Sequence, residues 1–257
     1  MTNQQVGTFC WWSLMTKDVE RANQFYHQLF DWSLEAMPIP GHDDATIYAA
    51  QHGGFANPVP LDEGFPGPSH WIPYISVADV DAAAERVKEL GGKVCVAPFD
   101  IPAVGRTAVL EDPSGAAFHV FSSADETDNL DMISSGEGEI CWMELMAEHP
   151  EAVIGFYRDM FGWSFKAPMR MNDVDYYSFE SDGKAIGGVL SRPPEVDAVP
   201  PAWMSYFSVN SVEQIASRVL ELGGSVVVPK TVIPETGYFA VFADSTGAHA
   251  SLFEMTN

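Results

Sequence analysis

The sequence predicts an α+β chain built from two homologous tandem domains, each made of two βαβββ modules. Three observations predict this architecture: an internal repeat, apolar spacing that alternates between strand-like and helix-like periods, and turn residues that separate short β-rich runs. Four modules of this size fit within the 257 residues.

The internal repeat spans most of the chain. Three residue pairs recur 131 positions later: Cys10-Trp11 as Cys141-Trp142, Phe25-Tyr26 as Phe156-Tyr157, and Trp32-Ser33 as Trp163-Ser164. Farther on, 20 of the 45 residues in 77–121 are identical to residues 209–253. This similarity indicates a tandem duplication. We expect domains over 7–122 and 139–254, joined by an acidic linker over 123–138 that has few apolar residues.

The first domain shows the module pattern twice. An apolar strand over 9–15 precedes a helix whose apolar residues keep helical spacing from Val19 to Phe30. A second strand over 71–77 precedes a helix over 80–90 that ends at Gly91-Gly92. The β-rich runs 93–97, 106–110 and 116–121 follow, the last after the turn sequence Asp112-Pro113-Ser114-Gly115.

The second domain repeats these elements and adds signals for helix starts. Pro150 suits a first helical position, and Ser211 with Gln214 three residues later forms a capping-box pattern. The pairs Gly53-Gly54 and Gly187-Gly188 lack the further residues of a phosphate-binding loop, so we interpret them as bulges or turns.

Composition excludes several classes of partner. With 13 Lys and Arg against 36 Asp and Glu, the net charge is −23, which disfavours binding to nucleic acid or to an anionic membrane surface. Three cysteines form no CxxC motif, and the N-terminal residues lack a signal-peptide pattern. We expect a cytoplasmic protein, monomeric or homodimeric, whose partner is a small molecule.

The order of these motifs resembles the vicinal oxygen chelate superfamily, which contains glyoxalase I, bleomycin-resistance proteins and extradiol dioxygenases. The residues that carry the resemblance are the FY pair of the first helix, the ELGG helix end and the DPSG turn before the last strand. The segments QFYHQLFDW and GFYRDMFGW, together with FDIPAVGR and EDPSGAAF, are similar to the tandem-domain branch of mycobacterial and actinobacterial glyoxalase-like antigens and hydroxylase-like proteins. The resemblance implies that paired modules curve their mixed sheets into a cup that holds a ligand, often beside a divalent metal.

When the family's metal-ligand positions are mapped residue by residue onto this sequence, few of them carry a metal ligand. The family's ligand positions fall at Trp11, Trp142, Ile72, Met204, His119 and Ser251, and of these only His119 is an ordinary transition-metal ligand. We therefore expect no metal cofactor. The alternative is a His70/His119 site for Zn, Ni, Fe or Mn, because His70 lies two residues before Ile72 on the same strand face.

The same positions define candidate ligand-binding residues if they point into the cups. Strand alternation adds neighbours on the same face, which gives the set Trp11, Ser13, Tyr74, His119, Trp142, Glu144, Tyr206 and Ser251. Glu144 stands out because a carboxylate among aromatic side chains must pair with a cation or become neutral. Tyr206 and His249 are its candidate proton partners, so these three residues form the candidate catalytic set. Structural roles for all of them remain open.

Two functions follow as expectations. The preferred one is a bleomycin-resistance-like protein that holds an aromatic or cationic organic molecule without metal chemistry. The alternative is an enzyme, a lyase, isomerase, dioxygenase or hydroxylase-like catalyst acting on a carbonyl or aromatic metabolite, with or without a divalent metal.

Overall fold

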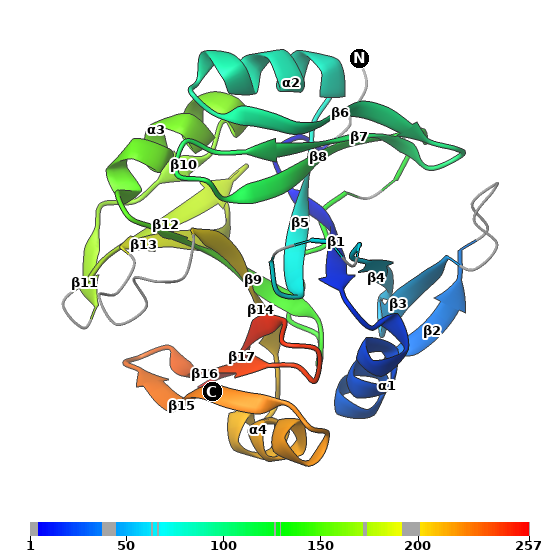
Figure 1. The fold of residues 1–257 in the computed structure, drawn as a ribbon. Helices are drawn as coiled ribbons and strands as arrows, with labels where there is room; N and C mark the ends of the chain where they lie inside the picture. The colour runs from blue at the N-terminus through cyan, green and yellow to red at the C-terminus, as the bar shows by residue number, and fades with distance from the viewer. Residues whose placement is uncertain are drawn as a thin grey trace. The chain divides into compact units, whose positions relative to one another are not determined.

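The computed structural model describes residues 5–37, 45–62, 64–65, 67–125, 127–128, 130–171, 174–191 and 201–256. Within the predicted linker, positions 126 and 129 lie outside this described part. Each half of the sequence forms two βαβββ modules, as Figure 1 shows. The predicted α+β architecture is confirmed.

The elements of the first sequence half are β1 (Phe9–Thr16), α1 (Val19–Phe30), β2 (Ser33–Ala36), β3 (Thr46–Ala50), β4 (Gly53–Pro60), β5 (His70–Ser76), α2 (Val80–Glu89), β6 (Lys93–Ile101), β7 (Gly105–Glu111) and β8 (Ala117–Ser123). Those of the second half are β9 (Ile140–Ala147), α3 (Pro150–Phe161), β10 (Ser164–Phe165), β11 (Met169–Met171), β12 (Val174–Ser181), β13 (Lys184–Ser191), β14 (Ala202–Ser208), α4 (Val212–Glu221), β15 (Ser225–Ile233), β16 (Gly237–Ala243) and β17 (His249–Met255). The short strand β11 was not predicted.

The strands of each sequence half form one mixed sheet. Among the described residues the first sheet has the order β2-β3-β4-β1-β5-β8-β7-β6, and the second has the order β10-β12-β13-β9-β14-β17-β16-β15, with β11 paired to β12. In every module the first strand pairs in parallel with the last, while the last three strands form antiparallel ladders. The two sheets therefore repeat one topology, as the duplication predicts.

The chain packs as two compact units, and each unit takes elements from both sequence halves. Unit 1 comprises the described residues of 1–11, 73–132 and 142–203, and unit 2 those of 12–72, 133–141 and 204–257. Unit 1 thus combines the second module with the third, and unit 2 combines the first with the fourth. The sequence left the pairing of modules open, because a repeat does not reveal which copies pack together.

The repeated FY pair explains in part why each unit combines modules from both sequence halves. In unit 1 the Tyr157 hydroxyl of α3 donates to Asp112 Oδ2 at 2.9 Å and lies 3.2 Å from Trp203 Nε1. In unit 2 Trp71 Nε1 donates to the Tyr26 hydroxyl at 3.0 Å. Burial, and then the charge of Asp112, raises the pKa of Tyr157 well above its ordinary value. Each FY tyrosine is therefore a buried hydrogen-bonding group of the core.

The segment predicted as an acidic linker is held by specific contacts. In unit 1 Leu130 is buried against Cys10 and Tyr74, and its carbonyl accepts a 2.8 Å hydrogen bond from Thr8 Oγ1. In unit 2, just after the predicted linker, the buried Glu139 carboxylate accepts hydrogen bonds from the His52 backbone N–H at 3.0 Å and ring at 2.8 Å. Composition alone does not reveal these contacts, because two or three well-placed side chains are enough to anchor a polar segment.

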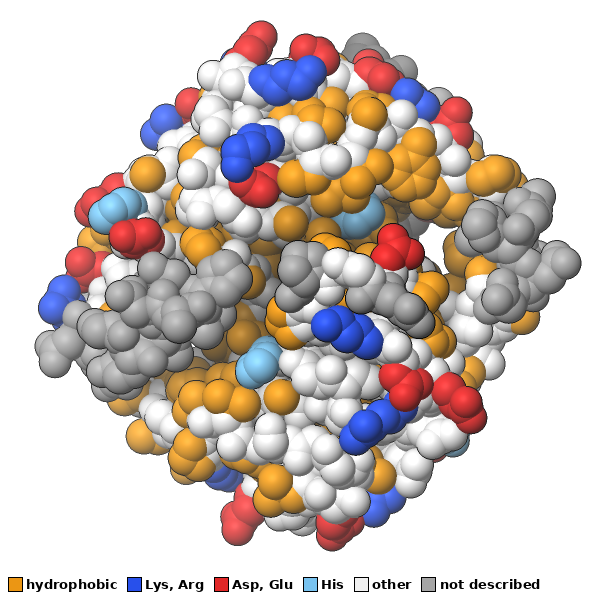
Figure 2. All heavy atoms as spheres, in the orientation of Figure 1, with side chains coloured by type: hydrophobic (Ala, Val, Ile, Leu, Met, Phe, Trp, Pro, Cys, Tyr) orange, Lys and Arg blue, Asp and Glu red, His pale blue; other side chains and the backbone are white. Residues whose placement is uncertain are grey.

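Most acidic side chains lie on outward faces. The buried ones within the described residues are Asp112, Glu139 and Asp244. Figure 2 shows acidic and basic side chains interspersed on the visible face, with hydrophobic side chains gathered over β6, β7 and β8 in the upper part of the view. No helix in the described part of the chain is both long and apolar enough to cross a bilayer.

Three of the helices begin with a side-chain cap. Asp18 accepts from the Arg21 backbone N–H at 3.0 Å, Asp79 accepts from Ala82 at 3.0 Å, and Ser211 accepts from Gln214 at 3.3 Å. The predicted start of α4 is thereby confirmed. Helix α3 differs, because its N-cap residue His149 makes no side-chain cap bond although Pro150 occupies the predicted position. A cavity of about 180 Å³ adjoins this helix start.

Replacing His149 with Asp is expected to stabilise the protein. Residue 149 is the repeat equivalent of Asp18, so the new carboxylate can accept a backbone N–H of the first turn and interact favourably with the helix dipole. The expected gain is about 1 kcal/mol in the free energy of unfolding. It is measured by urea denaturation at constant m-value, with His149→Ala as the control. A His149→Asp variant no more stable than His149→Ala would contradict the prediction.

Candidate functional site

Strand β9 places the candidate residues of the second repeat on one half-exposed sheet face. Met143, Leu145 and Ala147 are fully buried, whereas Trp142 and Glu144, which alternate with them, are only partly buried. This alternation is that of a strand with one face covered and the other open. Trp142 and Glu144 therefore share the open face, as predicted from their spacing.

A hydrogen-bonded chain links these two side chains through a residue that the sequence analysis missed. Trp142 Nε1 donates to the Tyr176 hydroxyl at 2.8 Å, and the Tyr176 hydroxyl in turn donates to the Glu144 carboxylate. Burial, followed by the charge of Glu144, raises the pKa of Tyr176 well above its ordinary value. Tyr176 therefore remains a neutral donor, and Glu144 its acceptor.

The space for Tyr176 comes from Gly188 on the neighbouring strand β13. Gly188 lies opposite Glu144 in the parallel ladder, and a Cβ atom at this position would collide with the Tyr176 hydroxyl and ring. A Cβ at Gly187 would collide with the Phe179 ring on the other face. Both glycines lie inside β13, and the β12–β13 register shifts by one residue directly beside Gly187, so the irregularity predicted for Gly187-Gly188 is a bulge next to the pair. The two glycines also make room for aromatic rings.

The first repeat carries different chemistry at the equivalent positions. Ser13 and Asn57, 131 residues before Glu144 and Gly188, lie opposite each other in unit 2. Ser13 is fully buried, and its hydroxyl donates to Asn57 Oδ1 at 2.9 Å. This neutral pair, of which Ser13 is buried and Asn57 partly buried, stands where the second repeat has Glu144 and Gly188.

His119 and Tyr74 lie side by side in unit 1 on the adjacent strands β8 and β5. Their rings stack with centroids 3.9 Å apart and an interplanar angle of 14°. Thr107 Oγ1 lies 3.2 Å from His119 Nδ1 and donates its proton to the Val120 carbonyl at 2.9 Å, so Nδ1 must be the donor to Thr107. Burial lowers the pKa of His119 to about 3, which keeps the ring neutral near pH 7.

An apolar cluster continues from this pair. Cys10, Tyr74 and Leu130 are buried together, with the partly buried Trp11 and Phe121 packed against them. Burial raises the pKa of the Cys10 thiol, which makes it a poor nucleophile. The structure thus brings Trp11, Tyr74 and His119 together around an aromatic, uncharged neighbourhood.

The remaining candidates belong to unit 2. Tyr206 is buried and lies opposite Ser251 on β17, whose fully buried hydroxyl has no hydrogen-bond partner among the described residues. His249 is exposed. Glu144 belongs to unit 1, so its pairing with Tyr206 and His249 stays a prediction, while Tyr176 is the partner observed within its own unit.

The donor set does not fit a catalytic metal. Among the family's ligand positions only His119 offers a strong donor, through Nε2, because its Nδ1–H is donated to Thr107. One such donor is too few for a catalytic metal site. His70, the alternative partner, stacks on Phe65, and its Nδ1 lies 2.9 Å from the Pro68 carbonyl. Within the described ranges no three His, Cys, Asp or Glu side chains gather into a possible metal site. No step of the proposal below is therefore routed through a metal.

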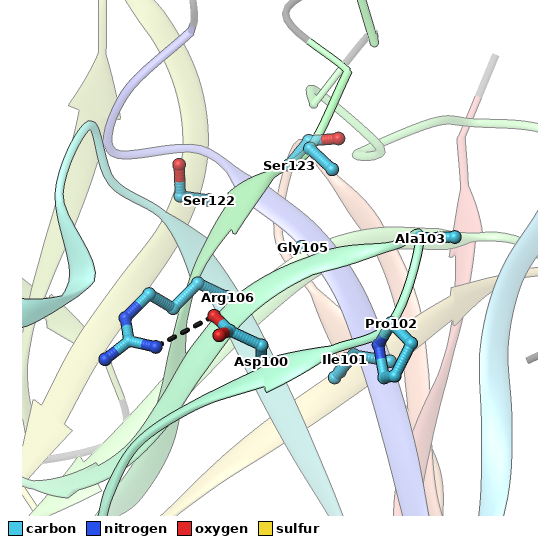
Figure 3. A pocket seen from close by; sticks show the side chains of 9 residues that line it. Asp100, Ile101, Pro102, Ala103, Gly105, Arg106, Ser122 and Ser123 are labelled. Atoms are coloured by element: carbon cyan, nitrogen blue, oxygen red, sulfur yellow. Dashed lines mark hydrogen bonds and ion pairs between the residues drawn. The ribbon is translucent and has the colours of Figure 1, made fainter. Parts of the chain in front are cut away.

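A surface pocket of about 350 Å³ lies at the β6–β7 hairpin and the end of β8 (Figure 3). The cationic side chain among the described residues that line it, Arg106, pairs with Asp81 at 2.7 Å and with Asp100 at 2.8 Å, and the second of these contacts is drawn in Figure 3. Because two carboxylates already neutralise the guanidinium, this pocket is poorly suited to an anionic ligand.

Comparison with known proteins shows which class of proteins the chain belongs to. The model of the Glyoxalase/Bleomycin resistance protein/Dioxygenase superfamily matches residues 8–120 and again residues 139–250. The chain therefore belongs to this superfamily and carries two copies of its domain. The resemblance inferred from the motifs is confirmed.

Individual relatives are similar along their whole length. "Putative glyoxylase CFP32" of Mycobacterium tuberculosis is 31% identical over 251 residues, which cover 96% of this chain and 95% of the relative. "Anthracycline biosynthesis protein DauV" of Streptomyces is 30% identical over 269 residues, covering 99% and 96%.

Solved structures share the fold at low identity. The Mn(II)-bound glyoxalase from Novosphingobium aromaticivorans aligns with a TM-score of 0.66 at 16% identity, covering 97% of this chain and 82% of that one. The 2,3-dioxygenase LapB from Pseudomonas aligns with a TM-score of 0.67 at 11% identity, covering 99% and 94%. At these identities the comparison speaks for the fold alone.

Proposed function

We propose that the protein binds a small aromatic or cationic organic molecule on the open sheet face of its second repeat, without metal chemistry. The observation that carries the proposal is the partly exposed group of Trp142, Tyr176 and Glu144 on that face. An aromatic surface with a few convergent polar groups is the usual composition of a small-molecule site. The poor metal donor set supports binding without a Lewis acid.

The family relationships agree with this class of ligand. The name of one relative, at 30% identity, refers to the biosynthesis of anthracyclines, which are aromatic small molecules. The net charge of −23 favours the approach of cations over anions. A cytoplasmic location is part of the same proposal, since it would give the protein access to metabolites and drugs inside the cell.

Trp142→Ala is expected to weaken binding of a planar aromatic probe by about tenfold, because the indole ring supplies most of the stacking surface. The probe is N-methylquinolinium, and binding is measured by isothermal titration calorimetry. Phe99→Ala, which removes an exposed aromatic ring from β6, is the control and should leave the affinity unchanged. Equal losses in the two variants, or no binding to the wild type, would contradict the proposal.

A second candidate function is an enzyme acting on a carbonyl or aromatic metabolite. It is favoured by the name of the relative CFP32 and by the Tyr176–Glu144 hydrogen bond, which is an arrangement suited to general acid–base chemistry. Elemental analysis of protein purified without chelators tests its metal-dependent form. Stoichiometric Zn, Ni, Fe or Mn would favour this second function over the first.

A further inference from the structure

We propose that the open face of the second repeat selects positively charged aromatic ligands over neutral ones, and that Tyr176 is the positioning residue that sets this selectivity. The inference rests on the proposed function and narrows its ligand class. Trp142 and Glu144 provide the recognition groups, and Tyr176 joins them through the hydrogen bonds described above.

The directions of the hydrogen bonds among Trp142, Tyr176 and Glu144 determine which chemical groups this face presents to a ligand. Because the Trp142 N–H is already donated to Tyr176, the indole offers its π face rather than a donor. Because the Tyr176 hydroxyl donates to Glu144, it stabilises the ionised form of that carboxylate. A π face beside an ionised carboxylate attracts a cation twice, through the ring quadrupole and through the charge. A neutral aromatic ligand gains only the stacking.

The first repeat keeps the tryptophan, as Trp11, but lacks the carboxylate at the position equivalent to Glu144. There Ser13 donates to Asn57, and the pair is neutral with Ser13 fully buried. The His119 ring is likewise neutral near pH 7 because burial lowers its pKa to about 3. Charge selectivity is therefore assigned to the second repeat alone, so that the duplicated domains have diverged in the ligands they accept.

Gly188 makes the arrangement possible. Any Cβ at this position collides with the Tyr176 hydroxyl and ring, so Gly188→Ala must displace Tyr176 without altering a charged group. Gly188→Ala and Tyr176→Phe thus test the positioning role in two independent ways, the first by moving the phenol and the second by removing its hydroxyl.

The test compares N-methylquinolinium with quinoline, a matched pair of planar probes that differ in charge at mildly alkaline pH. Dissociation constants are measured by calorimetry at physiological ionic strength. The wild type is expected to prefer the cation by about tenfold. Glu144→Gln should reduce this preference to about twofold, and Tyr176→Phe and Gly188→Ala to about threefold. The readout is the ratio between probes, because general damage to the face would weaken both probes alike.

Matched controls come from a second tyrosine–carboxylate pair. The Tyr177 hydroxyl, next in sequence, donates to Glu151 Oε1 at 3.2 Å at an exposed site. Glu151→Gln changes the net charge as Glu144→Gln does, and Tyr177→Phe removes one hydroxyl as Tyr176→Phe does. Both controls should keep the wild-type preference for the cation.

The outcomes separate this inference from the proposed function. If both probes bind the wild type equally well, the binding function stands and the selectivity inference fails. If neither probe binds, both fail. If Glu151→Gln lowers the preference as much as Glu144→Gln does, the selectivity arises from overall charge, and the role assigned to Tyr176 and Glu144 is wrong.

Discussion

Asp112→Ala is expected to lower the free energy of unfolding by about 4 kcal/mol. Asp112 is buried and accepts four hydrogen bonds. Its Oδ1 accepts from the Ser114 and Ala116 backbone N–H groups at 2.8 and 3.0 Å and from the Ser114 hydroxyl at 2.6 Å. Its Oδ2 accepts from Tyr157 at 2.9 Å. Alanine leaves all of these donors without that acceptor, and those of Ala116 and Tyr157 are buried.

The two carboxylate oxygens of Asp112 make different kinds of contact, one within a turn and one between sequence repeats. Oδ1 closes the Asp112-Pro113-Ser114-Gly115 turn between β7 and β8, which is local, whereas Oδ2 joins that turn to helix α3 of the other sequence repeat. Tyr157→Phe removes the contact to Oδ2 and also the acceptor of Trp203 Nε1, and it should cost about 1–2 kcal/mol. Urea denaturation followed by tryptophan fluorescence measures both variants, because the Trp203 ring lies 5.3 Å from that of Tyr157.

The equivalent residue of unit 2 provides an internal comparison. Asp244 closes the same turn through Oδ1, with Thr246 N at 2.7 Å and Ala248 N at 3.0 Å. Burial and then the charge of Asp244 raise the pKa of Tyr26, but no hydrogen bond of ordinary geometry reaches Oδ2 within the described residues. Asp244→Ala should therefore cost about 1 kcal/mol less than Asp112→Ala. An Asp112→Ala variant that is no less stable than Asp244→Ala would show that the Tyr157 contact adds nothing to stability.

Asp112 also illustrates which features of the structure can be predicted from the sequence and which cannot. The repeat, the turn residues and the apolar spacing were sufficient to predict the βαβββ modules, because each depends on residues close together in sequence. The contact from Asp112 to Tyr157 spans 45 residues and two repeats. Which repeats pack together is decided by tertiary packing, and nothing in the local pattern of Asp112 distinguishes a turn residue from one that also anchors a helix.

The candidate site likewise contains residues that the sequence predicts and one that it does not. Trp142 and Glu144 were found because both lie on one strand with a spacing of two, and that period alone places them on one face. Tyr176 was missed because it reaches Trp142 from 34 residues away, through a strand register that no local pattern determines. One signal was available: a glycine in a strand interior often marks the close approach of another group, and Gly188 has that role for Tyr176.

The stability of the protein is expected to fall steeply in acid because of His119. Its pKa is lowered by burial to about 3 in the folded protein, against about 6.5 in an unfolded chain. Between these two values the unfolded chain binds a proton that the folded protein does not. The stabilisation is therefore fully present above about pH 6.5 and is lost as the pH falls toward 3, by about 1.4 kcal/mol per pH unit from this group.

His119→Gln isolates this contribution from the carboxylates that titrate over the same range. The amide can keep a hydrogen bond to Thr107, but it does not titrate, so all other groups cancel when the variant is compared with the wild type at each pH. Near pH 7 the variant should be less stable, since it loses the 3.9 Å ring stack with Tyr74. The difference in unfolding free energy should shrink and then change sign as the pH falls, which denaturation at a series of pH values measures directly.

His249→Gln is the matched control for this acid dependence, because it makes the same substitution on β17, the repeat equivalent of β8, at an exposed side chain. It should stay within about 0.5 kcal/mol of the wild type throughout. A constant difference between His119→Gln and the wild type from neutral to acid pH would mean that His119 takes up its proton in the folded protein as readily as in the unfolded chain. The ring would then have access to water or to an anionic partner, and the uncharged neighbourhood of Trp11, Tyr74 and His119 would have to be described as a polar one.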